Sequence, residues 1–184
     1  MTKIELRKEF IKRRDAIPEF KRRQYSQLIA DIITDSHFYK SFDTVLSFVS
    51  IGSEVDTSEI INRALSNGKN VGVPYIENGI MSFKRINSTS DLIKGRFGIP
   101  TAPAGSPQIV NFENCLCIAP CLSADKDGYR LGYGGGYYDR FLAVNKNIFS
   151  VAVCFDELIS ESLPRDKFDV KVSMVITERK ETGV

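Results

Sequence analysis

The residues best equipped for chemistry lie between Asp125 and Arg140, where the chain reads Asp-Lys-Asp-Gly-Tyr-Arg-Leu-Gly-Tyr-Gly-Gly-Gly-Tyr-Tyr-Asp-Arg. Five of the thirteen glycines fall between Gly128 and Gly136. Glycine allows backbone N–H groups to approach a ligand closely and to adopt positive φ. The stretch also carries two arginines and three carboxylates: Arg130, Arg140, Asp125, Asp127 and Asp139. Bare amides, guanidinium and carboxylate together predict a site for phosphate and a divalent metal.

This segment differs from two common nucleotide-binding loops. No Gly-Lys-Ser/Thr closes it, so it is not a Walker A loop. Tyr137 stands where a dinucleotide fingerprint counted from Gly132 needs its last glycine. A plain glycine-rich connection with tyrosines on its walls is the alternative. Glycine density beside Arg130 and Asp139 favours phosphate binding.

Two acids outside the glycines are candidates for a site, whereas a third shows no local sign of a role. Asp139 lies in the first turn of the next predicted helix, where a carboxylate acts as a cap or dipole partner or, beside phosphate, holds magnesium. Glu54 follows a predicted strand and is either a solvated loop acid or a two-oxygen partner for an amidine-like edge, as in a pterin or guanine. Asp169, in Lys-Phe-Asp-Val-Lys, looks like an ordinary surface acid.

The amino-terminal segment is basic, although the whole chain has a net charge of only +2. Nine Lys or Arg residues stand against four acids between Lys3 and Arg23. Acids interleave these cations, which favours a solvated amphipathic face over nucleic-acid binding. No nucleic-acid partner is therefore expected.

The cysteines and the single histidine carry no recognisable site. Cys115, Cys117, Cys121 and Cys154 lack the paired spacing of a structural zinc site and are predicted to be buried, reduced thiols. His37 has no framework of a catalytic triad around it. Neither a signal peptide nor a membrane-spanning run is present, so a cytoplasmic protein without a membrane partner is expected.

Hydrophobic periodicity and turn residues predict the elements that position these groups. Helices are expected over Lys3–Asp15, Pro18–Thr34, Thr57–Ser66 (with Thr57 as N-cap and Gly68 as stop) and Tyr137–Ala143. Strands are expected over Thr44–Val49, Asn70–Val73 (ended by Pro74), Met81–Ile86, Leu116–Ala119, Phe149–Phe155 and Ser173–Thr177. A helical turn is expected near Ser90–Ile93 and a long irregular loop over Gly95–Pro107.

Strands that alternate with helices predict an α/β protein with a mainly parallel sheet. The length of 184 residues suits one domain over residues 1–184. In such a sheet ligands gather beyond the carboxyl ends of the strands, and the glycine-rich segment follows the predicted strand Leu116–Ala119.

Four segments together resemble one known family. The run Arg130-Leu-Gly-Tyr-Gly-Gly-Gly-Tyr-Tyr-Asp-Arg140, preceded by a strand ending at Pro120, resembles the signature of the 5-formyltetrahydrofolate cyclo-ligases, also called methenyltetrahydrofolate synthetases. Lys3-Ile-Glu-Leu-Arg7, Ser53-Glu-Val-Asp-Thr57 and Asp169 agree in order. The resemblance spans about Lys3 to Thr177 and implies a single three-layer α/β/α domain, expected to act as a monomer.

The resemblance implies an ATP- and Mg²⁺-dependent ligase of one-carbon metabolism. Such an enzyme converts 5-formyltetrahydrofolate to 5,10-methenyltetrahydrofolate and releases ADP and phosphate. The formyl oxygen attacks the γ-phosphate, and N10 then attacks the phosphorylated imidate. Phosphoryl transfer depends on positioning and charge neutralisation more than on a protein nucleophile, which agrees with the lack of a triad.

The resemblance also implies roles for single residues. ATP would be bound by Lys3, Arg7, Arg130, Leu131, Gly132, Tyr133, Gly134, Gly135, Gly136, Tyr137 and Tyr138. The folate would be bound by Val49, Glu54, Tyr133, Gly134, Gly135, Gly136 and Tyr137. Magnesium would be held by Asp139 and Asp169, and Arg130 and Tyr137 would be catalytic.

Two departures from the family pattern stand out, and the first is expected to affect substrate affinity more than reaction type. Pro120-Cys-Leu-Ser-Ala-Asp125 stands where the family usually has Pro-Gly-Leu-Ala-Phe-Asp. Gly135 stands where some relatives carry lysine, so the charge of the transition state is expected to rest more on Arg130, backbone amides and magnesium. A non-catalytic folate- or nucleotide-binding module on the same fold is the alternative function, and an RNA-binding protein is a more distant one.

Overall fold

The computed structural model describes residues 1–179 and 181–183, which are organised around one large sheet. Its order is β12-β11-β10-β7-β1-β2-β3-β6. The strands from β11 to β2 run parallel, whereas β12, β3 and β6 add antiparallel edges. The strand bounds are β1 Thr44–Ser47, β2 Asn70–Glu77, β3 Ile80–Ile86, β6 Gln108–Ile109, β7 Cys115–Pro120, β10 Phe149–Val153, β11 Met174–Ile176 and β12 Glu181–Gly183. The predicted α/β class with a mainly parallel sheet is confirmed.

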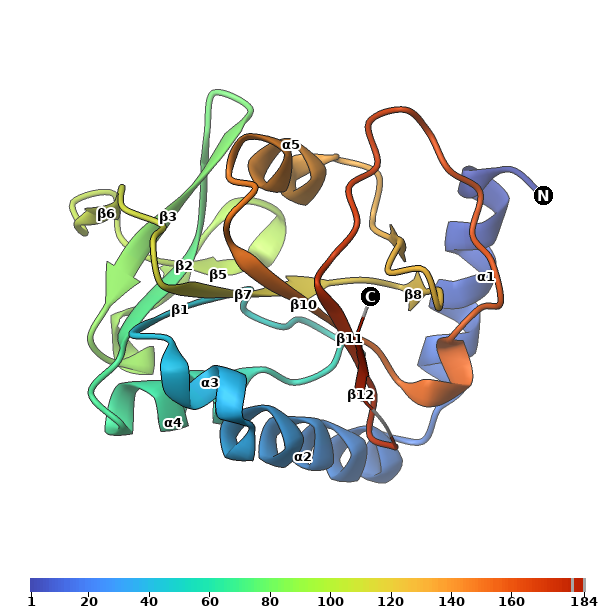
Figure 1. The fold of residues 1–184 in the computed structure, drawn as a ribbon, viewed down its shortest axis with the longest axis horizontal. Helices are drawn as coiled ribbons and strands as arrows, with labels where there is room; N and C mark the ends of the chain where they lie inside the picture. The colour runs from blue at the N-terminus through green and yellow to red at the C-terminus, as the bar shows by residue number, and fades with distance from the viewer. Residues whose placement is uncertain (180, 184) are drawn as a thin grey trace.

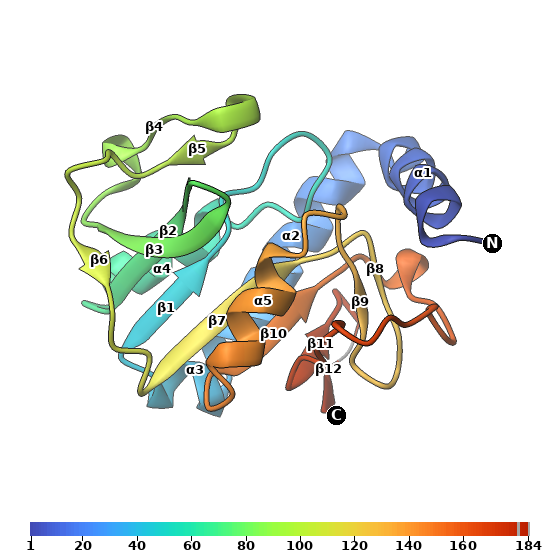
Figure 2. The ribbon, with the colours of Figure 1, turned by 90° about the horizontal axis from the view of Figure 1, so that it is seen from above.

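Helices cover both faces of the sheet, which gives three layers (Figure 1). One face carries α2 (Glu19–Asp35), α3 (His37–Ser41) and α4 (Ser58–Ser66), and the other carries α5 (Tyr137–Val144). Seen from above in Figure 2, α1 (Lys3–Ala16) stands beyond the end of the sheet, beside the short hairpin of β8 (Ser123–Ala124) and β9 (Arg130–Leu131). The first helix therefore packs on neither face of the sheet and lies near the carboxyl ends of the central strands.

Local sequence explains where the helices begin and end. A capping box opens α1, because the Thr2 hydroxyl accepts from the Glu5 amide and the Glu5 carboxylate accepts from the Thr2 amide. Thr57 is the N-cap residue of α4 as predicted, but its hydroxyl donates to the Phe48 carbonyl at 2.7 Å and makes no cap. Gly68 has a φ of 72°, the left-handed geometry that stops a helix.

The core is built on the three central strands. β7 is buried along Cys115–Ala119, and its neighbours β1 and β10 are buried in all but their first residues. All four cysteines are buried and unpaired, as the sequence predicts. A thiol in such a strand packs as a small apolar group.

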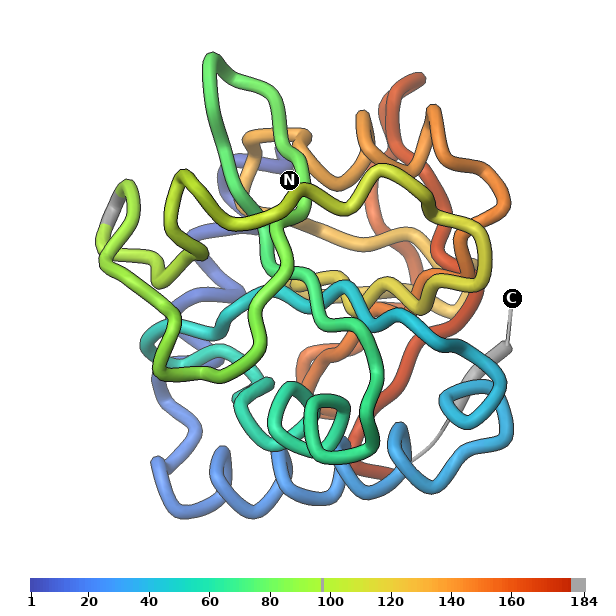
Figure 3. The backbone as a smooth tube through the Cα atoms, turned by 90° about the vertical axis from the view of Figure 1, so that its left-hand side faces the viewer, coloured from blue at the N-terminus to red at the C-terminus, as the bar shows by residue number. Residues whose placement is uncertain are grey.

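The structure corrects the expectation that Pro74 ends a strand. β2 continues through Pro74 to Glu77, paired with β3 over its whole length. Its pairing with β1 stops at Gly72, so beyond that point β2 has a free edge, where proline is tolerated. Figure 3 shows the resulting hairpin projecting past the rest of the sheet.

The loop predicted over Gly95–Pro107 is more regular than expected. It contains a 3₁₀ turn over Arg96–Gly98, and β5 (Pro100–Thr101) pairs with β4 (Ile93–Lys94). The helical turn expected near Ser90–Ile93 lies at Thr89–Asp91. Several short elements gave no sequence signal: α3, β6, β8, β9, β12 and the 3₁₀ turn Asp156–Leu158.

Candidate functional site

A cleft of about 1720 Å³ opens at the carboxyl ends of the central strands. Its lining includes Phe48 and Val49, just after β1, and Pro120, at the end of β7. Every residue proposed from the sequence for ATP, folate or metal lines it: Lys3, Arg7, Val49, Glu54, Arg130, Leu131, Gly132, Tyr133, Gly134, Gly135, Gly136, Tyr137, Tyr138, Asp139 and Asp169. Segments far apart in sequence therefore share one cavity.

The glycine-rich loop, Gly132–Gly136, forms one wall of the cleft between β9 and α5. It does not follow β7 directly, because the β8–β9 hairpin intervenes. Gly134 and Gly136 have φ angles of 102° and 63°, which favour glycine strongly. Gly136 is the N-cap of α5 and offers no side-chain cap, so the first amides of the helix remain available to an anion.

Two cations from α1 line the cleft, and one of them contacts this loop. Arg7 Nε donates to the Gly132 carbonyl at 2.8 Å, and its guanidinium packs so closely on Gly134 that a Cβ there would lie 3.3 Å from Arg7 Cζ. Lys3 Nζ lies 2.5 Å from Asp169 Oδ2 and 2.8 Å from Asp166 Oδ2. Burial by itself lowers the pKa of Lys3, but hydrogen bonds to Asp166 and Asp169 outweigh burial and raise it.

The two predicted metal ligands have different supports. Asp139 Oδ1 accepts from Arg130 Nη2 and from the Val170 amide, both at 3.1 Å. Asp169 Oδ2 accepts from Lys3 and from the Asp166 amide at 2.7 Å. Within the described part of the chain, the second oxygen of each carboxylate has no hydrogen bond to protein. Asp169 is thus not the free surface acid that its local sequence indicates.

These carboxylates fit magnesium and do not form a dedicated metal cage. Among residues 1–179 and 181–183, no group of three or more His, Cys, Asp or Glu side chains is arranged to hold an ion. Mg²⁺ is commonly bound by one or two carboxylates that share it with substrate phosphates and water. Two carboxylates with one oxygen each to spare, beside a phosphate-sized loop, match that pattern.

Arg130 is more enclosed than the sequence suggests. Its side chain is only 3% exposed, and besides Asp139 it donates to the Val170 carbonyl at 2.9 Å. Two of its five N–H donors are therefore already used in joining β9 to Asp139 and to the segment after Asp169. The positive charge of Arg130 therefore acts on the cleft indirectly, through its ion pair with Asp139.

The three tyrosines of the signature lie in different surroundings. The Tyr137 ring lies against Gly135, where a Cβ would be 2.7 Å from its Cε2. The Tyr138 hydroxyl is buried without a hydrogen-bond partner, and burial raises its pKa well above the ordinary value. Burial and the neighbouring Glu54 carboxylate likewise raise the pKa of Tyr133, whose hydroxyl donates to Glu54 Oε1.

Glu54 is held on both oxygens before any ligand arrives. Oε2 accepts from the Ile51 amide at 2.8 Å, and Oε1 accepts from Tyr133. Val49 also lines the cleft, as do apolar residues of the β2–β5 region: Pro74, Tyr75, Ile76, Met81, Ile93 and Ile99. A flat ring with a polar edge could lie here with its edge at Glu54.

One buried residue that contacts the cleft lining was missed by reasoning from sequence, since Arg14 donates to the hydroxyl of Tyr133. Arg14 occupies the same face of α1 as Lys3 and Arg7, because spacings of four and seven residues repeat on a helix. Its side chain is buried, which corrects the interpretation of this helix as a merely solvated basic face. Helical spacing of the three cations was the signal that could have found it.

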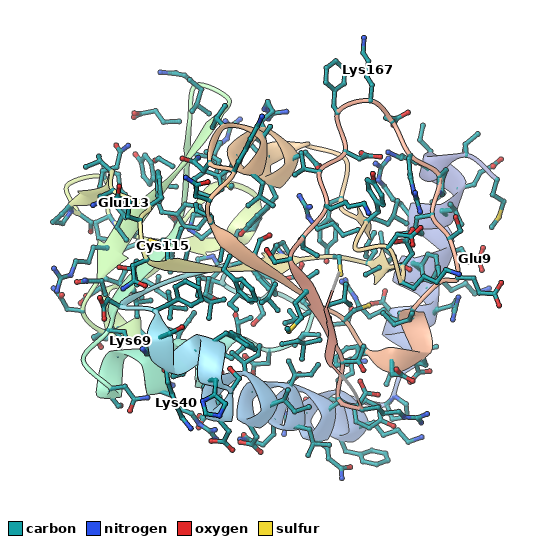
Figure 4. All side chains as sticks on the ribbon, viewed as in Figure 1. Glu9, Lys40, Lys69, Glu113, Cys115 and Lys167 are labelled. Atoms are coloured by element: carbon teal, nitrogen blue, oxygen red, sulfur yellow. The ribbon has the colours of Figure 1, made fainter. Side chains whose placement is uncertain are left out.

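The segment that carries Asp169 also contributes unexpected cations. Arg165 and Lys167 line the cleft, and Figure 4 shows Lys167 at the outer tip of this segment. Charged lining residues comprise the cations Lys3, Arg7, Lys94, Arg96, Arg130, Arg140, Arg165 and Lys167 and the acids Glu54, Asp139, Asp166 and Asp169. Cations prevail, which favours a polyanionic ligand.

Comparison with known proteins places the chain among enzymes of one kind. The model of the 5-formyltetrahydrofolate cyclo-ligase family matches residues 1–178. The cyclo-ligase of Mus musculus is 28% identical over 94% of this chain and 92% of its own length, and that of Mycolicibacterium smegmatis is 28% identical over 97% and 95%. The solved 5,10-methenyltetrahydrofolate synthetase of Aquifex aeolicus is 32% identical with a TM-score of 0.87, covering 100% of this chain and 93% of that one.

Proposed function

The chain belongs to the 5-formyltetrahydrofolate cyclo-ligase family, and from this premise we propose that its cleft unites ATP, Mg²⁺ and the folate at the glycine-rich loop. Its activity is the cyclisation of 5-formyltetrahydrofolate to 5,10-methenyltetrahydrofolate. One observation carries the proposal for the site. The cations of α1, the uncapped start of α5 and two carboxylates with spare oxygens all border one cleft.

The triphosphate of ATP would lie along Gly132–Gly136. Lys3 and Arg7 would neutralise it from α1, and the amides of Tyr137 and Tyr138 would meet it at the start of α5. Arg7 already touches Gly132 and Gly134, so the ATP-binding groups are in place before the substrate arrives. Arg130 would act mainly by holding Asp139, because its donors reach Asp139 and Val170.

Asp139 and Asp169 would hold Mg²⁺ through their unshared oxygens. When bound there, the ion would supply positive charge that offsets the negative charge building up during phosphoryl transfer. Lys3 would keep the Asp169 carboxylate turned toward the cleft, and the Val170 amide would do the same for Asp139.

The reduced folate would lie with its pterin edge on Glu54 and its flat ring system beside Val49 and Tyr133. The loop that carries Tyr133 also borders the triphosphate, so the formyl oxygen and the γ-phosphate would meet at Gly134–Gly136. The formyl oxygen attacks the γ-phosphorus and ADP leaves. N10 then attacks the imidate carbon and loses its proton, and phosphate departs with the former formyl oxygen. Tyr137, packed on Gly135, would border both reactants.

We further propose that residues 1–184 act as one monomeric, cytoplasmic domain. A single cluster of buried hydrophobic residues includes side chains from the sheet and from the helices on both of its faces, which supports one folding unit. In the described residues no helix has both the length and the apolar character to cross a bilayer. Size-exclusion chromatography with light scattering would test the monomer.

Asp139→Asn tests the site most directly. The asparagine keeps an acceptor for the Val170 amide but loses the charge that a metal requires, so we expect kcat to fall by about 100-fold or more. Initial rates are measured from methenyl-folate absorbance with 5-formyltetrahydrofolate and MgATP, and ADP release is followed in parallel.

Glu113→Gln is the matched control, since it also removes one acid. Figure 4 shows Glu113 on the opposite side of the molecule from Glu9 of α1, and it does not line the cleft. This variant should retain its rate. Near-normal turnover of Asp139→Asn at saturating Mg²⁺ would contradict the metal assignment, whereas absence of product and ADP in the unmodified protein would contradict the activity itself.

A further inference from the structure

Arg14 is a buried cation whose charge is not met directly by a carboxylate. Its side chain sits in the last turn of α1, and the residue is 7% exposed. Among the ion pairs of the described residues, none includes Arg14. Instead its Nε donates to Ser53 Oγ at 2.9 Å, and its Nη1 donates to the Tyr133 hydroxyl. Burial of an unpaired charge is costly, so we expect each of these hydroxyls to link Arg14 to a carboxylate by a second hydrogen bond.

Both hydroxyls do lead to acids. Ser53 Oγ donates to Asp15 Oδ1, and the Tyr133 hydroxyl donates to Glu54 Oε1. We name the set Arg14, Ser53, Asp15, Tyr133 and Glu54 the Arg14 relay. It joins α1, the turn after β1 and the glycine-rich loop, which are far apart in the sequence.

The direction of each bond follows from donor chemistry. A guanidinium can only donate, so the oxygens of Ser53 and Tyr133 must accept from Arg14. Each hydroxyl has one proton, which is then available only for the carboxylate on its other side. Arg14 therefore fixes the Tyr133 hydroxyl as a donor to Glu54.

A carboxylate fixed in this way is still able to bind a ligand. Each carboxylate oxygen has two lone-pair sites, and Tyr133 and the Ile51 amide use one on each oxygen of Glu54. The remaining sites can accept a second, two-pronged donor edge. Because both protein bonds exist beforehand, little orientational freedom is left for the ligand to remove.

We infer that Arg14 is a positioning residue for the folate: through the Tyr133 hydroxyl it orients Glu54 to receive the donor edge of the pterin. The inference rests on the proposed role of Glu54. It also assigns two tasks to one helix, because Arg7 borders the ATP side of the loop and Arg14 supports the folate side.

The test compares Tyr133→Phe, Arg14→Gln and the double variant. Tyr133→Phe keeps the ring and removes only the hydroxyl that joins Arg14 to Glu54. Each single change should raise the KM for 5-formyltetrahydrofolate by about tenfold and the KM for ATP by less than about twofold, since a hydrogen bond to a charged group is lost on the folate side alone. The double variant should be no worse than the poorer single variant, because both break one relay.

Arg13→Gln is the control for charge. It removes the neighbouring arginine of α1, which lies on the Phe10 ring and donates to the Glu157 carbonyl outside the cleft. Both KM values should stay unchanged. Folate and ATP KM values that rise together, additive effects in the double variant, or single variants within twofold of the parent would overturn the inference.

Two further measurements separate the possible failures. If Arg14→Gln does not fold, calorimetric titration of Tyr133→Phe with 5-formyltetrahydrofolate decides alone, and unchanged affinity rejects the relay. Glu54→Gln tests the premise: if it binds folate normally, the proposed role of Glu54 fails. If Glu54→Gln loses affinity and Tyr133→Phe does not, only the role of Arg14 fails.

Discussion

At the scale of the residue, Arg140 places a positive charge beside Gly135, which has no side chain of its own. Its Nη1 donates to the Gly135 carbonyl at 3.0 Å, and its guanidinium lies 4.9 Å from the Tyr137 ring centre. The family resemblance implies a lysine at the position of Gly135 in some relatives. A lysine side chain here would meet Tyr137, because even a Cβ at Gly135 would lie 2.7 Å from that ring. Arg140 is placed to compensate for the missing charge.

We therefore expect Arg140→Gln to lower kcat by about tenfold, as the loss of one charge-assisted contact to the transferring phosphoryl group would. Initial rates at saturating MgATP and folate provide the measurement. Lys146→Gln, an exposed lysine just after α5, removes the same charge outside the cleft and should leave kcat unchanged. Equal rates for the two variants would show that Arg140 has no such role.

The buried cysteines lead to a prediction about thiol reactivity. Burial raises the pKa of Cys117 to about 12, so at pH 8 its thiol is neutral and inaccessible. An aromatic disulfide reagent should label none of the four cysteines within minutes in the native protein and all four after denaturation. Rapid labelling of the native protein would show that this strand is not buried.

The same shift has a consequence for stability with a defined sign. The unfolded thiol ionises near pH 8.5 and the folded one near pH 12, so the folded state holds the proton more tightly. The contribution is complete below the unfolded pKa and is lost as the pH rises from about 9 toward 12. Urea unfolding across this range should show the loss, and Cys117→Ala should reduce its slope.

At the scale of the element, the glycine-rich loop works because α1 can approach it. Gly134 has a φ of 102°, and the Arg7 guanidinium occupies the space in which a side chain would start. The loop conformation and the position of the helix therefore depend on one another. Capping of α1 by Thr2 and Glu5 holds Lys3 and Arg7 at the rim of the cleft.

Gly134→Ala should disturb both elements. The alanine would be strained at this φ by about 1 kcal/mol or more, and its Cβ would push against Arg7. We expect the KM for ATP to rise by about tenfold with a smaller change for the folate. ATP titrations at saturating folate measure it. Gly105→Ala, where an added Cβ meets nothing within 4 Å, serves as the control, and equal KM values would reject the coupling.

At the scale of the whole molecule, the cleft is a junction of three segments that the sheet does not hold together. α1, the glycine-rich loop and the segment around Asp169 meet through Lys3–Asp169, Arg7–Gly132 and Arg130–Val170. A ligand that spans these segments must stabilise the folded state, because it binds the native arrangement and not the unfolded chain.

MgATP at about 100 times its Kd should stabilise the protein by about 2.7 kcal/mol, which for a chain of this size corresponds to a rise in Tm of about 5–10 °C. A thermal melt followed by circular dichroism measures the shift. Removal of the metal with a chelator should reduce it, and Asp139→Asn should abolish the part that depends on Mg²⁺. An equal shift with and without metal would contradict the placement of Mg²⁺ at Asp139.

The sequence by itself determined the reaction class and the α/β pattern, and it pointed to residues that line one cleft in the structure. Glycine spacing, periodic apolar positions and capping residues act within a few neighbours, so they are readable along the chain. The glycine-rich segment shows this most clearly. Between Arg130 and Asp139 the glycines that permit its backbone conformation and the charged residues proposed for its chemistry are neighbours in the sequence. Short strands such as β8 and β9 were not predicted, because two residues are too few to show the alternation of apolar and polar side chains that marks a strand.

Only the tertiary structure decided which charges meet. Asp169 is an ordinary acid until Lys3 lies 2.5 Å away, and Arg14 is one of several basic residues until Ser53 and Tyr133 enclose it. β2 continues through Pro74 because its pairing with β1 ends at Gly72. The register of the strands decides this, and local propensity does not. Contacts between residues more than a hundred positions apart leave no local pattern in the sequence, since packing of the whole chain brings them together.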